Sequence, residues 1–119
     1  YLEEGKAGKH TAAFFGWIAD NGDPDNFLNV FFNSDNRGST NRAFYVNQEV
    51  DQLLEEAQQI TDESKREEIY KEVQQIIVED APFVFLNHMK MQIPVRTSVE
   101  NYVLYPTNNK YFHKVWLDQ

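Results

Sequence analysis

Apolar residues recur at helical spacing over two neighbouring stretches in the middle of the chain, residues 48–60 and 63–79. Asn47 and Asp62 immediately precede these stretches, and side-chain oxygens at such positions accept the free backbone N–H groups of a first helical turn. Pro82 cannot continue the second stretch, and the short connection between the two predicts an αα-hairpin. The two apolar faces comprise Val50, Leu53, Leu54, Ala57 and Ile60, and Ile69, Val73, Ile76 and Ile77. Both predicted helices are amphipathic, so each needs a partner surface.

The segments on either side of this pair are rich in aromatic and β-branched residues, which favour strands. Strands are predicted at residues 11–17, 83–86, 91–95, 99–105 and 111–117, the first two of them buried. Asn108 and Asn109 predict a turn between the last two, and Pro94 marks a sheet edge or a strand end. The predicted fold class is therefore α+β, with a central helix pair flanked by strands.

A short helix and a polar loop are predicted ahead of the helix pair. The dipeptide Asn21–Gly22 is a turn signal, and Asp23 is suited to cap a helix that has Pro24 at its first position. This helix has an apolar face formed by Phe27, Leu28, Phe31 and Phe32. Residues 33–42 are polar and are predicted to form a surface loop.

The composition is that of a globular domain. The chain has 119 residues, of which 41% are hydrophobic and 25% charged, a balance that argues against disorder. No apolar run approaches the ~20 residues of a membrane-spanning helix, and the lack of cysteine excludes disulfides and thiolate metal sites. The sequence opens at Tyr1 with neither Met nor an export signal, so we expect it to be a piece of a longer protein.

The negative charge is concentrated in the predicted helix pair. Residues 49–80 hold 11 acidic and three basic residues, which accounts for the whole net charge of −8. A nucleic-acid partner would require a basic stripe with interleaved aromatic residues, and the sequence has none. A solvated acidic helix face explains the charge. An alternative is a small acidic interaction module that docks a basic protein partner.

The residue patterns of catalytic and metal sites are missing. His10, His88 and His113 have no second ligand at helical spacing, and the aspartates from Asp20 to Asp25 do not have the spacing of a calcium-binding EF-hand. No nucleophile elbow, P-loop or dinucleotide fingerprint occurs. We therefore expect no enzyme activity, no metal and no cofactor.

Asp20 is a candidate for ligand contact. It lies three residues after Trp17, just past a predicted strand, whereas the nearby Asp23 is accounted for as a helix cap. A carboxylate beside an aromatic wall can receive a cationic group through charge-assisted hydrogen bonds. Asp is also common in turns for local hydrogen-bonding reasons, and the residues alone place this second role slightly ahead.

Residues 16–27 read GWIADNGDPDNF and resemble the GWxxDxxDPxxF signature of the dipeptide/oligopeptide branch of the extracellular solute-binding proteins, family 5, which serve ABC importers. Further family-like elements follow in the same order. They lie at residues 47–54 (NxxVDxLL), 62–74 (with Arg66, Tyr70 and Gln74), 80–86 (beginning Asp-Ala-Pro) and 102–117 (ending Val-Trp-Leu). The resemblance covers the chain from about residue 12 to residue 117, and it matches the C-terminal end of a much longer family sequence.

The resemblance implies a class II periplasmic-binding-protein-like fold of two lobes that close around a ligand. Residues 1–87 would then belong to the C-terminal ligand-binding lobe, and residues 88–119 would cross back to the other lobe. In peptide-binding members the signature Asp meets the ligand's α-ammonium group and the Trp lies close by. Asp20 and Trp17 hold these positions here.

The function implied by the resemblance is that of the peptide-binding component of an ABC importer. Its partners would be a short peptide and the permease subunits of the transporter. Its location would be extracytoplasmic, either in a periplasm or on the cell surface as a lipoprotein anchored outside this chain. The family also includes proteins that bind nickel, haem or sugars, so a nickel or haem binder is an alternative.

Overall fold

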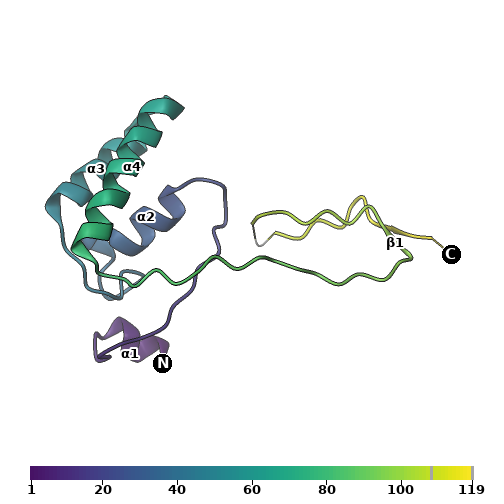
Figure 1. The fold of residues 1–119 in the computed structure, drawn as a ribbon, viewed down its shortest axis with the longest axis horizontal. Helices are drawn as coiled ribbons and strands as arrows, with labels where there is room; N and C mark the ends of the chain where they lie inside the picture. Colours follow the sequence, from purple (N-terminus) through teal and green to yellow (C-terminus); the bar gives the residue numbers. More distant parts are fainter. Residues whose placement is uncertain (108, 119) are drawn as a thin grey trace.

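The computed structural model describes residues 1–107 and 109–118, which form a helical region and a long extended arm (Figure 1). The elements in chain order are α1 (Leu2–Lys6), α2 (Asp25–Phe32), the 3-10 helix η1 (Ser34–Asn36), α3 (Gln48–Gln59), α4 (Glu63–Asp80), β1 (Val99–Glu100) and β2 (Trp116–Leu117). The arm, residues 83–118, leads away from the end of α4 and turns back on itself. Because the arm projects from the helices, the molecule is elongated and measures 58 × 39 × 21 Å. None of the described helices is long and apolar enough to cross a lipid bilayer.

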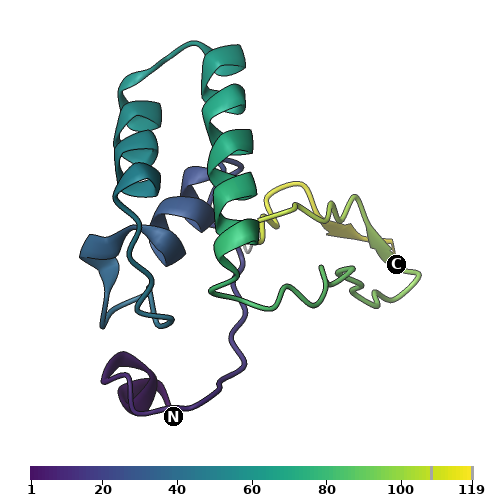
Figure 2. The ribbon, with the colours of Figure 1, turned by 60° about the vertical axis from the view of Figure 1, so that its left-hand side comes forward.

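The predicted helix pair is confirmed, because α3 and α4 run side by side as a hairpin with α2 packed across them (Figure 2). The Asn47 side chain accepts the N–H groups of Glu49 and Val50, and the Asp62 side chain accepts that of Lys65. Both predicted caps are therefore present. The core between the three helices consists of Leu28, Phe32, Val50, Leu54, Ala57, Tyr70, Val73 and Ile77.

Helix α4 ends at a residue in the left-handed conformation. Ala81 has φ 47° and ψ 47°, and its N–H donates to the Ile77 carbonyl. The preceding residue, Asp80, is fixed by two donors, the Tyr45 hydroxyl at 2.6 Å and the Asn47 amide at 2.8 Å. The last turn of α4 is thereby tied to the segment that leads into α3, and the chain changes direction immediately after it.

The polar segment 33–42 is more ordered than the predicted surface loop. It contains the helix η1, and Asn41 within it is fully buried. The Asn41 amide donates to the carbonyls of Asn33 and Tyr45, and its oxygen accepts the Tyr45 N–H. A buried amide is tolerated because these bonds replace the ones it would make to water. The loop prediction was wrong at this residue.

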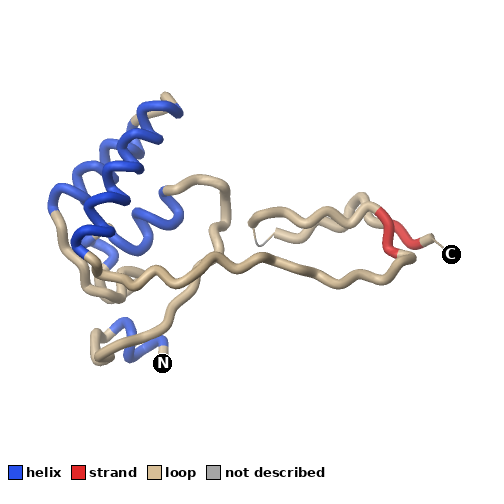
Figure 3. Tube along the Cα trace, in the orientation of Figure 1, coloured by secondary structure: helices blue, strands red, loops and turns tan. Residues whose placement is uncertain are grey.

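Three of the five predicted strands are not formed among the described residues, as Figure 3 shows. Residues 11–17, 83–86 and 91–95 are extended but unpaired, and most of their side chains are exposed. A strand exists only with a hydrogen-bonded neighbour, and apolar composition does not supply that neighbour. The strands formed in the described part of the chain are β1 and β2, which pair antiparallel with Val99 opposite Leu117. The last two predicted strands, 99–105 and 111–117, are thus formed over two residues each. The predicted turn at Asn108–Asn109 includes a residue outside the described ones.

Candidate ligand-binding site

Trp17 and Asp20, the two predicted site residues, lie on the signature loop, which we define as residues 17–24. This loop leads into α2 and has only Ala19 buried among its residues. The Trp17 indole is 41% exposed and meets the Phe31 ring edge-on, with 5.5 Å between ring centroids. Its Nε1–H donates to Oδ1 of Asn26 at 3.1 Å. The indole is thus held against α2 while part of it remains exposed to solvent.

Asp20 presents its carboxylate to solvent. Its backbone N–H donates to the same Asn26 Oδ1, at 3.2 Å, but no hydrogen bond or ion pair within the described part of the chain reaches its side chain. The local turn bond is made by Asn21, whose Oδ1 accepts the Asp23 N–H at 3.0 Å. The structure therefore brings Trp17 and Asp20 onto one loop through Asn26, and it leaves the Asp20 carboxylate available to an incoming cation.

Asp23 has two structural contacts, of which the sequence predicted one. Its Oδ1 accepts the Asp25 N–H at 3.0 Å at the start of α2, as expected of a capping residue. Pro24 precedes this helix and does not occupy its first position, a small correction to the prediction. The second contact is an ion pair with Arg66 of α4, whose Nη2 lies 2.8 Å from Oδ2 and 2.9 Å from Oδ1.

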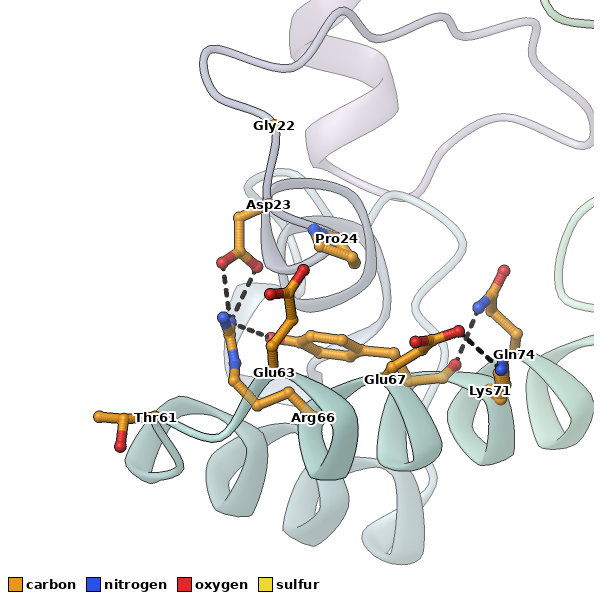
Figure 4. A pocket seen from close by; sticks show the side chains of 10 residues that line it. Gly22, Asp23, Pro24, Thr61, Glu63, Arg66, Glu67, Lys71 and Gln74 are labelled. Atoms are coloured by element: carbon orange, nitrogen blue, oxygen red, sulfur yellow. Dashed lines mark hydrogen bonds and ion pairs between the residues drawn. The ribbon is translucent and has the colours of Figure 1, made fainter.

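Arg66 joins three parts of the helical region (Figure 4). Besides Asp23, its guanidinium donates to the Tyr70 hydroxyl at 2.8 Å and to the Ala57 carbonyl of α3 at 3.1 Å. Sequence reasoning singled out Arg66 and Tyr70 as family-like residues but did not find the pairing with Asp23. The signal for it is weak, because 43 residues separate the partners. The ion pair fixes the signature loop to the helix hairpin.

The pKa values of Asp23 and Tyr70 are shifted from their ordinary values by burial and by their hydrogen bonds. Burial alone would raise the pKa of the Asp23 carboxyl, but the Asp25 N–H and the Arg66 guanidinium outweigh it and lower that pKa below its ordinary value. Burial raises the pKa of the Tyr70 hydroxyl, despite the bond from Arg66. Asp23 is therefore ionised at neutral pH and acts as a structural anion.

A polar hollow of about 710 Å³ lies between the signature loop and α4 (Figure 4). It is lined by Gly22, Asp23, Pro24, Thr61, Glu63, Arg66, Glu67, Tyr70, Lys71 and Gln74. Its two cations are already paired, Arg66 with Asp23 and Lys71 with Glu67, the latter at 2.7 Å. Neither Trp17 nor Asp20 lines it. We therefore assign this hollow to the scaffold and not to the ligand site.

No cluster of three metal-ligating side chains is found among residues 1–107 and 109–118. Two of the histidines contact aromatic residues outside the site, since His10 meets Phe15 edge-on and His113 meets Tyr111 edge-on.

The candidate site consists of the partly exposed Trp17 indole and the unpaired Asp20 carboxylate. The loop that carries them is held by the hydrogen bonds to Asn26 and by the ion pair between Asp23 and Arg66. An indole and a carboxylate placed in this way are suited to binding a cationic group.

The relatives of this chain are solute-binding proteins. It is 39% identical over 118 residues to heme-binding protein A of Haemophilus influenzae, 33% identical over 115 residues to di/tripeptide-binding protein 3 of Pseudomonas aeruginosa and 33% identical over 120 residues to the dipeptide-binding protein of Escherichia coli. These alignments cover 97–99% of the chain but only 22% of each relative. No family model matches the chain.

A solved structure shows the same arrangement of the backbone. The periplasmic binding protein DppA from Helicobacter pylori, in complex with the peptide STSA, superimposes with a TM-score of 0.81 at 32% identity. The match covers the whole of this chain and 24% of DppA. The prediction of an α+β chain forming part of a periplasmic-binding-protein fold is thus confirmed. The chain is similar over nearly its whole length to dipeptide-binding proteins, and it spans about a fifth of the length of these relatives.

Proposed function

We propose that the full-length gene product containing this chain is the peptide-binding component of an ABC importer. It captures a short peptide between two lobes outside the cytoplasm and delivers it to the permease, without chemical change to the ligand. The observation that carries the proposal is the match to a relative solved with a bound peptide, at a TM-score of 0.81 over the whole chain.

Within this function, Asp20 receives the α-ammonium group of the peptide and Trp17 forms the wall beside it. The support is geometric. The Asp20 carboxylate is exposed, and no described side chain neutralises it. A charge-assisted hydrogen bond to an ammonium group is stronger once lobe closure removes bulk water. The partly exposed Trp17 indole offers apolar surface on the same loop, where Asn26 links it to the Asp20 backbone.

The extended arm supports the proposed division into lobes. In this proposal residues 1–87 belong to one lobe, and residues 88–119 cross to the other. Beyond residue 87 the arm carries many large apolar side chains that are exposed, among them Met89, Val95 and Val103. Exposed apolar surface of this kind is typical of a region that another part of a protein covers.

Haem binding is the second candidate, because one relative with 39% identity is named heme-binding protein A. The two functions differ in what the site must recognise. A peptide brings an ammonium group for Asp20, whereas haem brings an iron and carboxylates. Native mass spectrometry of the gently purified gene product, followed by denaturation, separates them: released short peptides support the proposal, and a released tetrapyrrole supports the alternative.

The role of Asp20 is tested by calorimetry on the full-length gene product with short peptides and their N-acetylated forms. Asp20→Ala is expected to weaken binding of peptides with a free amino terminus by roughly 10- to 100-fold, because a hydrogen bond to a charged group contributes about 1.5–3 kcal/mol. Asp35→Ala serves as the matched control, since Asp35 is an exposed aspartate outside the signature loop and only its backbone N–H makes a described hydrogen bond. Unchanged affinity in Asp20→Ala would refute the assignment.

A further inference from the structure

We infer that Asn26 is a positioning residue of the ligand site, whose side-chain oxygen sets the relative placement of Trp17 and Asp20. The inference rests on the proposed function, in which these two residues meet the peptide's amino terminus. Asn26 itself is half-buried and does not need to touch the ligand. Its contribution would be to specificity for a free amino terminus.

One atom links the two site residues. Oδ1 of Asn26 accepts the Trp17 indole Nε1–H at 3.1 Å and the Asp20 backbone N–H at 3.2 Å. An amide oxygen has two lone pairs, so it can serve both donors at once. The indole and the Asp20 backbone are therefore fixed relative to the same point.

Asn26 belongs to helix α2, whose beginning is fixed to the rest of the helical region. Asn26 is in the first turn of α2, and its own N–H donates to the Asp23 carbonyl at 3.1 Å. The core residues Leu28 and Phe32 hold the helix further along, and Oδ1 of Asp25 accepts the Gln58 amide of α3 at 3.0 Å. The beginning of α2 is thus fixed to the helix hairpin, while the loop before it is largely exposed.

The remainder of the loop offers little other support for the Asp20 backbone. Residues 16–18 and 20–22 are exposed, and only Ala19 between them is buried. A ligand site binds selectively when its groups are held in place before the ligand arrives. Without the Asn26 oxygen, Asp20 would keep its charge but lose its fixed position next to the indole.

The test uses the full-length gene product and three variants. Asn26→Ala removes the acceptor, Asn26→Asp keeps an oxygen in its place, and Asn29→Ala is the matched control. Asn29 lies in the same helix, and no described hydrogen bond involves its side chain. The probe is a tripeptide library of randomised sequence, compared with the same library after N-acetylation. The captured fraction of each is counted by mass spectrometry after equilibrium dialysis.

We expect Asn26→Ala to reduce the preference for free over acetylated tripeptides by about fivefold, the effect of losing a neutral hydrogen bond. Exchange of the Trp17 indole proton and the Asp20 amide proton, followed by NMR, should accelerate by a similar factor. Asn26→Asp should restore both readouts, and Asn29→Ala should leave them at the wild-type level.

The inference is overturned if Asn26→Ala keeps the wild-type preference, or if Asn29→Ala reduces it equally. Asp20→Ala, measured alongside, separates this failure from a failure of the proposed function. If Asp20→Ala abolishes the preference and Asn26→Ala does not, only the role of Asn26 is wrong. If Asp20→Ala itself retains the preference, the proposed contact with the amino terminus is wrong.

Discussion

The helical region and the arm contain similar apolar residues but bury them to opposite extents. Leu54 in α3 is fully buried, whereas Leu86 in the arm is 67% exposed. A helix satisfies its own backbone hydrogen bonds, so two or three amphipathic helices can complete a small core among themselves. An extended segment must find its hydrogen-bond partners on another segment. The comparison shows that the helices bury their apolar side chains mainly against one another, while the described part of the arm leaves most of its own exposed.

The largest expected effect tests this contrast with one chemical change at two positions. In the 119-residue chain, Leu54→Ala should destabilise the fold by about 3 kcal/mol because it leaves a cavity in the core. Leu86→Ala should change the free energy of unfolding by less than about 0.5 kcal/mol, since the side chain contacts solvent. Denaturant titrations followed by circular dichroism at the helical signal measure both values. Equal losses would remove the distinction between the two regions.

The same pair of substitutions sharpens the comparison in the full-length gene product. If the arm is covered there, Leu86→Ala should cost about 2–5 kcal/mol, close to the cost of Leu54→Ala. A small effect of Leu86→Ala in both proteins would show that the arm is not covered by the rest of the protein.

A smaller effect concerns the ion pair that fixes the signature loop to the hairpin. Because the pKa of Asp23 is lowered in the folded state, its carboxylate stabilises the fold above the unfolded pKa, and this stabilisation is lost as the pH falls through the folded pKa. Asp23→Asn should cost about 1 kcal/mol at neutral pH, a modest value for a pair that is partly exposed.

This prediction is checked by urea denaturation between about pH 6 and pH 3, the range in which a carboxylate titrates. The wild-type chain should lose more stability than Asp23→Asn over this range. Glu67→Gln is the control, since its pair with Lys71 is solvent-exposed on both sides and should contribute little. Parallel pH profiles for the wild type and Asp23→Asn would contradict the structural role of the pair.

The smallest effect is expected at the boundary between the two regions. Ala81 holds a left-handed conformation that glycine adopts without steric cost. Ala81→Gly should raise the free energy of unfolding by up to about 1 kcal/mol, measured by thermal denaturation. Ala57→Gly, within α3, should have the opposite sign, because glycine weakens a helix interior and removes a buried methyl group. Destabilisation by both substitutions would argue against the left-handed cap.

The sequence predicted best what is determined by neighbouring residues. The caps at Asn47 and Asp62 and the apolar faces of α3 and α4 follow from local spacing, and the structure confirms them. The strands predicted at residues 11–17 and 83–86 were wrong because composition indicates a preference for extended chain but not the presence of a partner.

For the candidate site, the sequence placed Trp17 and Asp20 on one loop but did not indicate the contacts that hold them there. Trp17 and Asp20 stand on one loop, as their spacing indicated. The bond from Trp17 to Asn26 depends on how the loop folds back onto α2, and the ion pair between Asp23 and Arg66 joins segments far apart in the chain. Neither contact produces a periodicity or a motif in the sequence, so neither could be predicted from the sequence alone.

The left-handed residue at the end of α4 has a mechanical consequence. Asp80 is fixed by Tyr45 and Asn47, and Ala81 follows it directly. Beyond Ala81, the rings of Phe83 and Phe85 contact the Phe32 ring, with centroid separations of 5.1 and 6.4 Å. The base of the arm is therefore clamped on both sides of the left-handed residue. The direction in which the arm leaves the helices is set by this clamp and by the backbone angles of Ala81 within it.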